Sequence, residues 1–284
     1  MTRALLGGLS PVAFLRRHWQ KRPLLVRGAF PRFRDPVTPK RLLALSLKGE
    51  VDSRLVLTGG GRRTFEVWHG PQHPKRLRRL QAANGTLLVE NVDRHVRGVR
   101  ALQSAFDFIP RWRFDDVMVS FATPGGGVGP HIDSYDVFLI QGRGRRRWSI
   151  DSRAQPVHRS GLDLKVLRSF RPELSWVLEP GDMLYVPPGL SHEGVALEEA
   201  LTYSVGFRAP SHRALVAAFA ERLLASTPED RLYGDPDLQP AAARGDIEPK
   251  ALVRMRRIIR AEIDRALRLD LADDLRKLLG VRRS

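Results

Sequence analysis

The middle of the chain alternates short apolar runs with turns that contain glycine or proline. Between residues 111 and 210, five such runs stand out: DDVMVSFAT, YDVFLIQG, RRRWSI, DMLYVP and LTYSVGF. Runs of this length, rich in Val, Ile, Phe and Tyr and bounded by turn residues, are typical of β-strands. Several short strands in succession predict a mainly β fold of the sandwich or barrel type.

The flanking segments carry other patterns. In residues 1–110 the signals are mixed: SPVAFLRRHWQ predicts a helix capped by Ser10 with Pro11 in its first turn, and RPLLVRGAF predicts a strand ending at Gly28. Residues 211–284 read as helices, the first of them capped by Ser211. Near the C-terminus apolar residues recur every three or four positions, at Leu252, Met255, Ile259, Ile263 and Leu267. We therefore expect two domains, residues 1–210 and 211–284.

Composition narrows the class of protein. The chain has 284 residues and is 42% hydrophobic, which suffices for a sizeable core. No apolar run approaches 18 residues, so we expect no membrane span. The N-terminus lacks the apolar segment of a secretory signal, and we expect a cytoplasmic protein. Cysteine is absent, so a metal site must use His, Asp or Glu.

The formal net charge of +17 indicates an anionic partner or a generally basic surface. Of the 48 basic residues only 7 are lysine, so arginine dominates. Residues 211–284 carry 15 basic and 12 acidic side chains, so most of the excess lies in residues 1–210. One cluster is HPKRLRRL, residues 73–80. Nucleic acid or a ribonucleoprotein fits such a surface, but an Arg-rich, solvated surface without a partner fits equally well.

The sequence GGGVGPHID places His131 and Asp133 two residues apart behind a glycine-rich loop. In a strand, residues i and i+2 point to the same face, so both side chains can enter one interior. The segment EPGDMLYVPPGLSH ends in His192, and its Gly, Pro and His spacing resembles the second sequence motif of the cupin superfamily. Together, His131, Asp133 and His192 form the 2-His-1-carboxylate set that holds Fe(II) and leaves positions open.

A co-substrate site is what separates an oxygenase from an inert metal-binding cupin. The strands Asp136–Gln141 and Arg145–Ile150 flank a GRG turn, which indicates a hairpin. Alternation places Arg146, Trp148 and Ile150 on one face, which we expect to be inward. An inward guanidinium needs a carboxylate partner, and 2-oxoglutarate supplies one. The alternatives are that Arg146 pairs with an internal acid or faces solvent.

Six segments within residues 14–210 resemble the bacterial JmjC-type ribosomal oxygenases. In chain order they are FLRRHWQKRPLLVRGAF, EVDSRLV, VWHGP, DDVMVSFATPGGGVGPHIDSYDVFLIQGRGRRRW, LEPGDMLYVPPGLSHEGVALE and YSVGFRAP. The best known members hydroxylate an arginine of large-subunit ribosomal protein number sixteen. The resemblance implies a double-stranded β-helix (cupin/JmjC) with catalytic iron ligands His131, Asp133 and His192. It also implies that Arg146 binds 2-oxoglutarate, with Ser120 as a further co-substrate contact.

The family pattern continues with a helical dimerisation region and a winged helix. This sequence ends at Ser284 after its helical stretch, so a winged helix is not expected. The resemblance implies a homodimer through residues 211–284 and a ribosomal protein substrate, with ribosomal RNA nearby as one way to accommodate the positive charge. Hydroxylation of another residue type, demethylation, and a non-catalytic RNA- or ribosome-binding cupin remain alternatives.

Overall fold

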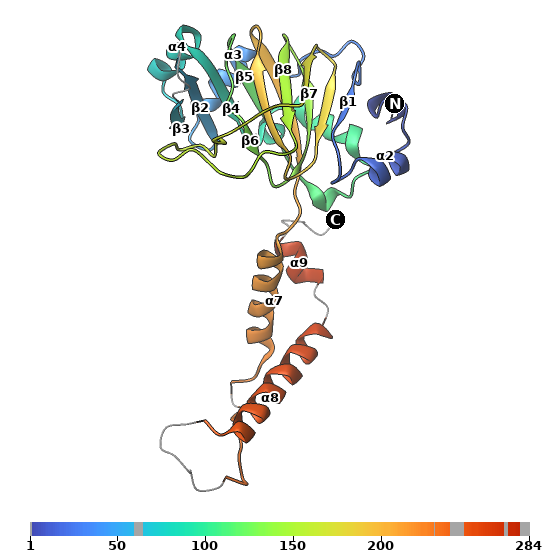
Figure 1. Cartoon of the computed structure of the whole chain (residues 1–284), viewed down its shortest axis with the longest axis vertical. Coiled ribbons are helices and arrows are strands. Elements are labelled where there is room, and N and C mark those ends of the chain that lie inside the picture. The colour runs from blue at the N-terminus through green and yellow to red at the C-terminus, as the bar shows by residue number, and fades with distance from the viewer. Residues whose placement is uncertain (1, 60–64, 230, 239–246, 270–271, 279–284) are drawn as a thin grey trace. The chain divides into compact units, whose positions relative to one another are not determined.

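A computed structural model describes residues 2–59, 65–229, 231–238, 247–269 and 272–278 (Figure 1). The chain divides into two compact units, residues 1–208 and 209–284. The first unit holds all of the described strands, and the described part of the second is helical. None of the described helices combines the length and apolar character needed to cross a membrane.

The first unit opens with short helices and strands. In chain order they are α1 (Thr2–Leu5), α2 (Pro11–Arg17), β1 (Leu24–Val26), α3 (Pro39–Ser46), β2 (Ser53–Thr58), β3 (Phe65–His69), α4 (Pro74–Ala82), β4 (Asn84–Val89), α5 (Val92–His95) and α6 (Arg97–Arg100), then two 3₁₀ turns, η1 (Ala101–Phe106) and η2 (Arg111–Arg113). The predicted capping of α2 is confirmed, since the Ser10 hydroxyl accepts a hydrogen bond from the Ala13 amide at 3.2 Å. The first strand ends at Val26, not Gly28, because Gly28 adopts a φ of 56° in a turn.

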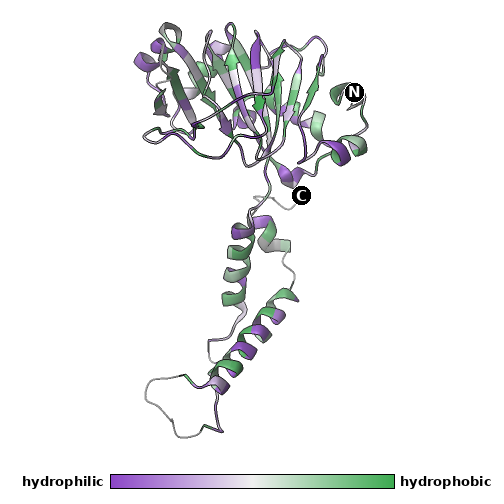
Figure 2. Ribbon diagram, viewed as in Figure 1, coloured by the Kyte–Doolittle hydropathy of each residue, from purple (hydrophilic) through white to green (hydrophobic). Residues whose placement is uncertain are grey.

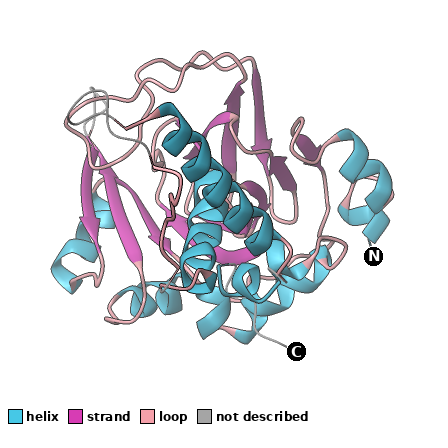
Figure 3. Ribbon diagram, turned by 90° about the horizontal axis from the view of Figure 1, so that it is seen from below, coloured by secondary structure: helices cyan, strands magenta, loops and turns pink. Residues whose placement is uncertain are grey.

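Eight further strands complete the unit: β5 (Phe114–Ala122), β6 (His131–Ile132), β7 (Asp136–Gln141), β8 (Arg146–Asp151), β9 (Leu174–Leu178), β10 (Met183–Val186), β11 (Ser191–Ala196) and β12 (Ala200–Phe207). They form an eight-stranded sheet in the order β1-β10-β7-β12-β5-β4-β2-β3 and a four-stranded sheet in the order β6-β11-β8-β9. Both sheets are antiparallel. At one end of the larger sheet, α4 packs against β4 and β2 (Figures 1 and 3).

The prediction that the two strands around the GRG turn form a hairpin is wrong. β7 pairs with β10 and β12 in the larger sheet, whereas β8 pairs with β11 and β9 in the smaller one. The turn therefore carries the chain from one sheet to the other. From β5 to β12 the chain changes sheet repeatedly, so residues far apart in sequence become neighbours between the sheets.

Two apolar layers hold the first unit together. Phe138 and Ile140 of β7 belong to the larger core, with residues of the N-terminal helices such as Phe14. Val137 and Leu139, on the other face of the same strand, belong to a smaller cluster with Trp148 of β8. A strand buried on both faces reads as a continuous apolar run, which is why DVFLIQ shows no alternation.

The second unit contains α7 (His212–Ser226), α8 (Pro249–Leu267) and α9 (Ala272–Leu278). The Ser211 hydroxyl caps α7 by accepting from the Ala214 amide at 3.1 Å, as predicted. Figure 2 shows α8 with separate hydrophobic and hydrophilic sides. Among the described residues of this unit only Ala266 is fully buried. The three helices thus contribute almost no core of their own.

Candidate metal and co-substrate site

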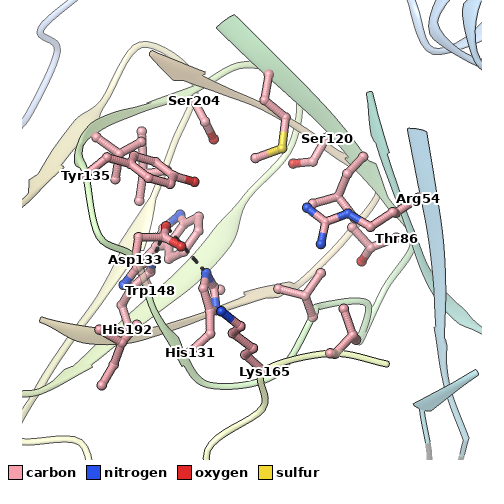
Figure 4. Close-up of a pocket in the computed structure, with 18 of the residues that line it drawn as sticks. Arg54, Thr86, Ser120, His131, Asp133, Tyr135, Trp148, Lys165, His192 and Ser204 are labelled. Carbon is pink, nitrogen blue, oxygen red and sulfur yellow. Dashed lines mark ion pairs between the residues drawn. The ribbon is translucent and has the colours of Figure 1, made fainter. Parts of the chain in front are cut away.

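His131, Asp133 and His192 converge between the sheets, although 61 positions separate the two histidines. β6 pairs with β11 so that His131 lies directly opposite His192, and their ring centroids are 4.4 Å apart. An Asp133 carboxylate oxygen lies 3.8 Å from Nε2 of His131 and 3.6 Å from Nε2 of His192 (Figure 4). One ligand atom from each residue lies within 4.8 Å of the other two. The three donors therefore face one common point.

Backbone carbonyls hold both imidazoles in the orientation that a metal requires. Nδ1 of His131 lies 3.0 Å from the Gly129 carbonyl, and Nδ1 of His192 lies 3.0 Å from the Leu190 carbonyl. Each Nδ1–H donates to its carbonyl, which leaves the Nε2 lone pair free for a metal. Burial, and then the neighbouring His131, lower the pKa of His192 to about 4. The imidazole of His192 is accordingly neutral at physiological pH, as ligation demands.

Arg146 enters the same cavity from β8, and its side chain is buried as expected. Nη1 donates to the hydroxyls of Ser120 at 3.1 Å and Thr202 at 3.3 Å, which lie opposite each other on β5 and β12. The guanidinium carbon also lies 5.5 Å from the Trp148 ring centroid. Ser120 and Arg146, both candidates from the sequence, are thus in direct contact.

The guanidinium of Arg146 keeps unused hydrogen-bonding capacity. Its Nε is buried without a hydrogen-bond partner, and within the described residues no carboxylate lies within 4.0 Å of the group. Burial lowers its pKa to about 10, so the group stays charged at neutral pH. A buried cation without a counter-ion is very costly, so this site fits an incoming carboxylate.

The cavity that these residues line has a volume of about 660 Å³. Tyr135, Trp148 and Lys165 also line it (Figure 4). Its size is within the range of sites that take small ligands, and it holds both the three metal-type donors and the uncompensated cation.

Two glycines near the site are required by close packing. A Cβ on Gly194 would lie 2.7 Å from the Trp148 ring, which stands beside the His192 ring at 5.9 Å between centroids. A Cβ on Gly127, in the loop before His131, would lie 2.6 Å from the Gly194 carbonyl oxygen. The loop can therefore pass close to β11 only without side chains at these positions.

An acidic hollow of about 470 Å³ adjoins the cavity. It shares Asp133 and Tyr135 with the cavity, together with Arg54, Met118 and Ser204. Its charged lining residues are four acids, Glu90, Asp115, Asp116 and Asp133, and three arginines, Arg54, Arg94 and Arg208. Arg54 pairs with Glu90 at 3.2 Å and Arg208 pairs with Asp115 at 2.6 Å. In the part of the chain that the structure describes, Asp116 has no basic side chain within ion-pair distance.

Asp116 is the free carboxylate of this hollow. It accepts a hydrogen bond from the Asn91 amide at 2.8 Å, yet burial raises its pKa to about 6. Asp116, Met118 and Ser120 alternate along β5 and so share one face. Four residues of strand place Asp116 about 13 Å from Ser120, because each residue advances about 3.3 Å. The free carboxylate and Ser120, the candidate co-substrate contact, thus stand at opposite ends of one row.

The sequence did not single out Asp116, Thr202 or Tyr135. All three stand in strands or turns that the apolar pattern outlines, but their function depends on register. Thr202 faces Arg146 only because it pairs with Ser120 across β12 and β5. The alternation of Asp116 with Ser120 in DDVMVSFAT is the one signal that could have found it.

Comparison with known proteins agrees with this geometry. The JmjC domain family matches residues 101–215. The Escherichia coli protein "Ribosomal protein uL16 3-hydroxylase" is 44% identical over 87% of this chain and 65% of its own length. A probable ribosomal oxygenase of Haemophilus influenzae is 33% identical over 78% of this chain and 55% of its own. The chain therefore spans less than two thirds of the length of these relatives.

Solved structures of E. coli YcfD are similar over nearly the whole chain. One crystal structure has a TM-score of 0.82 at 41% identity and covers 96% of this chain and 71% of that one. A second, described as a ribosomal oxygenase in complex with cobalt and 2-oxoglutarate, has a TM-score of 0.77 at 41% identity, covering 96% and 70%. With this coverage and identity, and with a β-rich JmjC fold followed by C-terminal helices, the chain belongs to the JmjC-domain ribosomal oxygenase family.

Proposed function

We propose that the protein is an Fe(II)- and 2-oxoglutarate-dependent oxygenase that hydroxylates an arginine side chain of ribosomal protein uL16. The observation that carries this proposal is the pairing, in one cavity, of the His131, Asp133 and His192 donors with the uncompensated Arg146 cation. One similar protein supports it twice: the E. coli relative is named for 3-hydroxylation of uL16, and a crystal structure of it contains cobalt and 2-oxoglutarate.

The protein residues have separable roles. His131, Asp133 and His192 would hold Fe(II), which supplies oxygen activation coupled to oxidation of 2-oxoglutarate. Arg146 would bind the distal carboxylate of the co-substrate, with Ser120 and Thr202 holding the guanidinium in place. Trp148 covers His192 and helps to keep water from the site.

The acidic hollow supports an arginine as the target residue. A substrate guanidinium that enters it would meet the unpaired Asp116 carboxylate and could bind it through two parallel hydrogen bonds. This local arrangement accommodates a basic substrate on a chain with a net charge of +17, which would otherwise repel it. A neutral target such as Asn or His, and a non-catalytic RNA- or ribosome-binding cupin, would not require this free acid beside the site. A lysine ammonium or a methylated cation, as in demethylation, would not engage both carboxylate oxygens in the planar geometry that arginine provides.

The catalytic unit in this proposal is residues 1–210, acting in the cytoplasm, where ribosomes are available. Proximity of ribosomal RNA to the bound enzyme remains a prediction at this point.

Incubating the full chain with Fe(II), 2-oxoglutarate, ascorbate and a uL16 fragment should add 16 Da to one arginine, as read by tandem mass spectrometry. Replacing Asp116 with Asn should lower kcat/KM for the fragment by roughly 30-fold or more, because losing one partner of a buried charge pair costs about 2 kcal/mol or more. Turnover of 2-oxoglutarate without the fragment should be little changed.

The matched control is Asp107→Asn, a carboxylate at the end of η1 outside the cavity and the hollow. It should hydroxylate at the wild-type rate. Because Asp116 titrates near pH 6, wild-type kcat/KM should fall as the pH drops below about 6, while in Asp116→Asn this fall should be absent. Modification of a lysine or histidine, or an unaffected Asp116→Asn variant, would contradict the arginine assignment.

We further propose that residues 211–284 form a homodimer. Leu252, Met255, Ile259 and Leu267 of the predicted apolar stripe are between 37% and 58% exposed, and Ile263 is half-buried. A helix with one apolar stripe must cover it, and the other helices of this unit leave it open. A two-fold pairing with a second copy is the commonest closed solution.

Light scattering of the full chain at micromolar concentration should give twice the 32.0 kDa of the monomer. Replacing Ile259 with Glu should shift the mass toward the monomer, whereas Arg257→Glu, on the side of α8 away from the apolar stripe, should leave it unchanged. The dimer should persist in chelator, because the metal donors belong to the other unit. A mass near 32.0 kDa for the wild type would refute the dimer.

A further inference from the structure

Helix α4 presents a dense, exposed basic surface that the catalytic proposal does not use. Its exposed cations are Lys75, Arg76, Arg78 and Arg79, which we call the α4 basic face. Leu77 and Leu80 point inward and anchor the helix on the core. Figure 2 shows α4 as one of the most hydrophilic elements of its unit. The helix contains no acidic residue, so the four charges reinforce one another.

Trp68 of β3 organises this surface. The guanidinium carbons of Arg76 and Arg79 lie 5.9 Å and 4.9 Å from the centroid of its ring. Glu66, also on β3, pairs with Arg79 at 2.9 Å. Within the described residues no carboxylate lies within 4.0 Å of Lys75, Arg76 or Arg78. Arg76 is therefore held on an aromatic ring while its charge remains uncompensated.

The α4 basic face lies on the side of the sheet opposite the catalytic cavity. Side chains alternate along β3, so Glu66 and Trp68 face α4 while Phe65 and His69 face the other way. His69 lines the cavity and pairs with Asp163 at 2.6 Å. A partner on α4 can thus be bound while the cavity remains open to substrate.

We propose that the α4 basic face binds the phosphodiester backbone of RNA. Cations at i, i+3 and i+4 on a helix lie about 5–6 Å apart and can contact successive phosphates. Arginine suits this ligand because its planar fork matches phosphate oxygens and is weakly hydrated. The Arg76 guanidinium is held on the Trp68 ring and offers a planar surface of the kind on which RNA bases stack. An acidic protein or lipid surface shares the charge but makes no use of this stacking surface.

The test is fluorescence anisotropy of the full chain with a labelled 20-nucleotide single-stranded RNA, titrated at several salt concentrations. The variant is Arg76→Gln with Arg78→Gln, which keeps good helix-forming residues in α4. The matched control is Arg16→Gln with Arg17→Gln, two exposed arginines of α2 in the same unit. Both double variants lower the net charge by the same two units.

The α4 variant should bind RNA about 10- to 30-fold more weakly at 0.1 M salt. Its slope of log K against log salt should fall by about 1.4, because each lost phosphate contact removes about 0.7. The α2 control should stay within twofold of the wild type, and both variants should melt like it.

If both double variants bound RNA equally weakly, the effect would be general charge attraction and the proposal would be overturned. The proposal would also be overturned if the wild type bound phosphatidylglycerol vesicles more strongly than RNA and only the α4 variant lost that vesicle binding, because the face would then bind a lipid surface. RNA binding is measured without iron or 2-oxoglutarate, so it can succeed or fail independently of the catalytic proposal. Turnover of 2-oxoglutarate should be unchanged in both variants.

Discussion

Replacing Asp133 with Ala should reduce 2-oxoglutarate turnover by at least about 100-fold, since even partners behind the metal ligands typically contribute 10- to 100-fold. Asp133 is the only carboxylate of the three donors, and its oxygen faces both imidazoles. His131→Ala should have the same effect. Succinate formation followed by NMR measures turnover, and calorimetry with Mn(II) measures metal binding directly.

The control for this prediction is Asp163→Ala, a carboxylate that lines the same cavity but pairs with His69 instead. It should retain metal binding and most of the turnover. Thermal melting without metal should show that Asp133→Ala remains folded, because removing the carboxylate removes no packing contact from the core. Full turnover in either Asp133→Ala or His131→Ala would disprove the assignment of the metal ligands.

Arg146→Gln should raise the KM for 2-oxoglutarate by about 30-fold or more, with less effect on binding of the metal. The estimate follows from the loss of a buried charge pair, which costs about 2–5 kcal/mol at about 1.4 kcal/mol per factor of ten. The folding stability of the Arg146→Gln protein without ligands should not fall greatly, because Arg146 has no counter-ion among the described residues.

Arg147→Gln is the matched control, since Arg147 is the next residue on β8 and is exposed on the opposite face. Its KM should equal that of the wild type. The stabilisation of the fold by added 2-oxoglutarate, read as a shift in melting temperature, should vanish in Arg146→Gln and persist in Arg147→Gln. An unchanged KM in Arg146→Gln would place the co-substrate carboxylate elsewhere.

The prediction of a β-rich fold with C-terminal helices is confirmed, and its success has a physical basis. Strands such as β7 and β10 are buried on both faces, so they appear in the sequence as unbroken apolar runs. Helices α2 and α7 carry serine caps that mark their first turns. These signals are local, and local signals can be read from one sequence.

The hairpin prediction that failed, and the site residues that the sequence did not reveal, depend on pairing between segments that are distant in the sequence. The GRG turn has the composition of a hairpin, but the apolar cluster of Val137, Leu139 and Trp148 places β7 and β8 in facing sheets. Composition could not show this, because two apolar strands joined by a short turn can either pair side by side in one sheet or face each other from two sheets, and both arrangements bury them. Asp116 and Thr202 depend in the same way on the register of β5 and β12.

The two imidazoles take their orientation from main-chain carbonyls two residues earlier in the chain. In many metalloproteins a carboxylate side chain does this task, and its replacement retunes the metal. Here no substitution can delete the accepting oxygen. Attempts to engineer a different metal preference should therefore act on the three donors or on the surroundings of Asp133, because substitution cannot remove the hydrogen bonds that orient the two imidazoles.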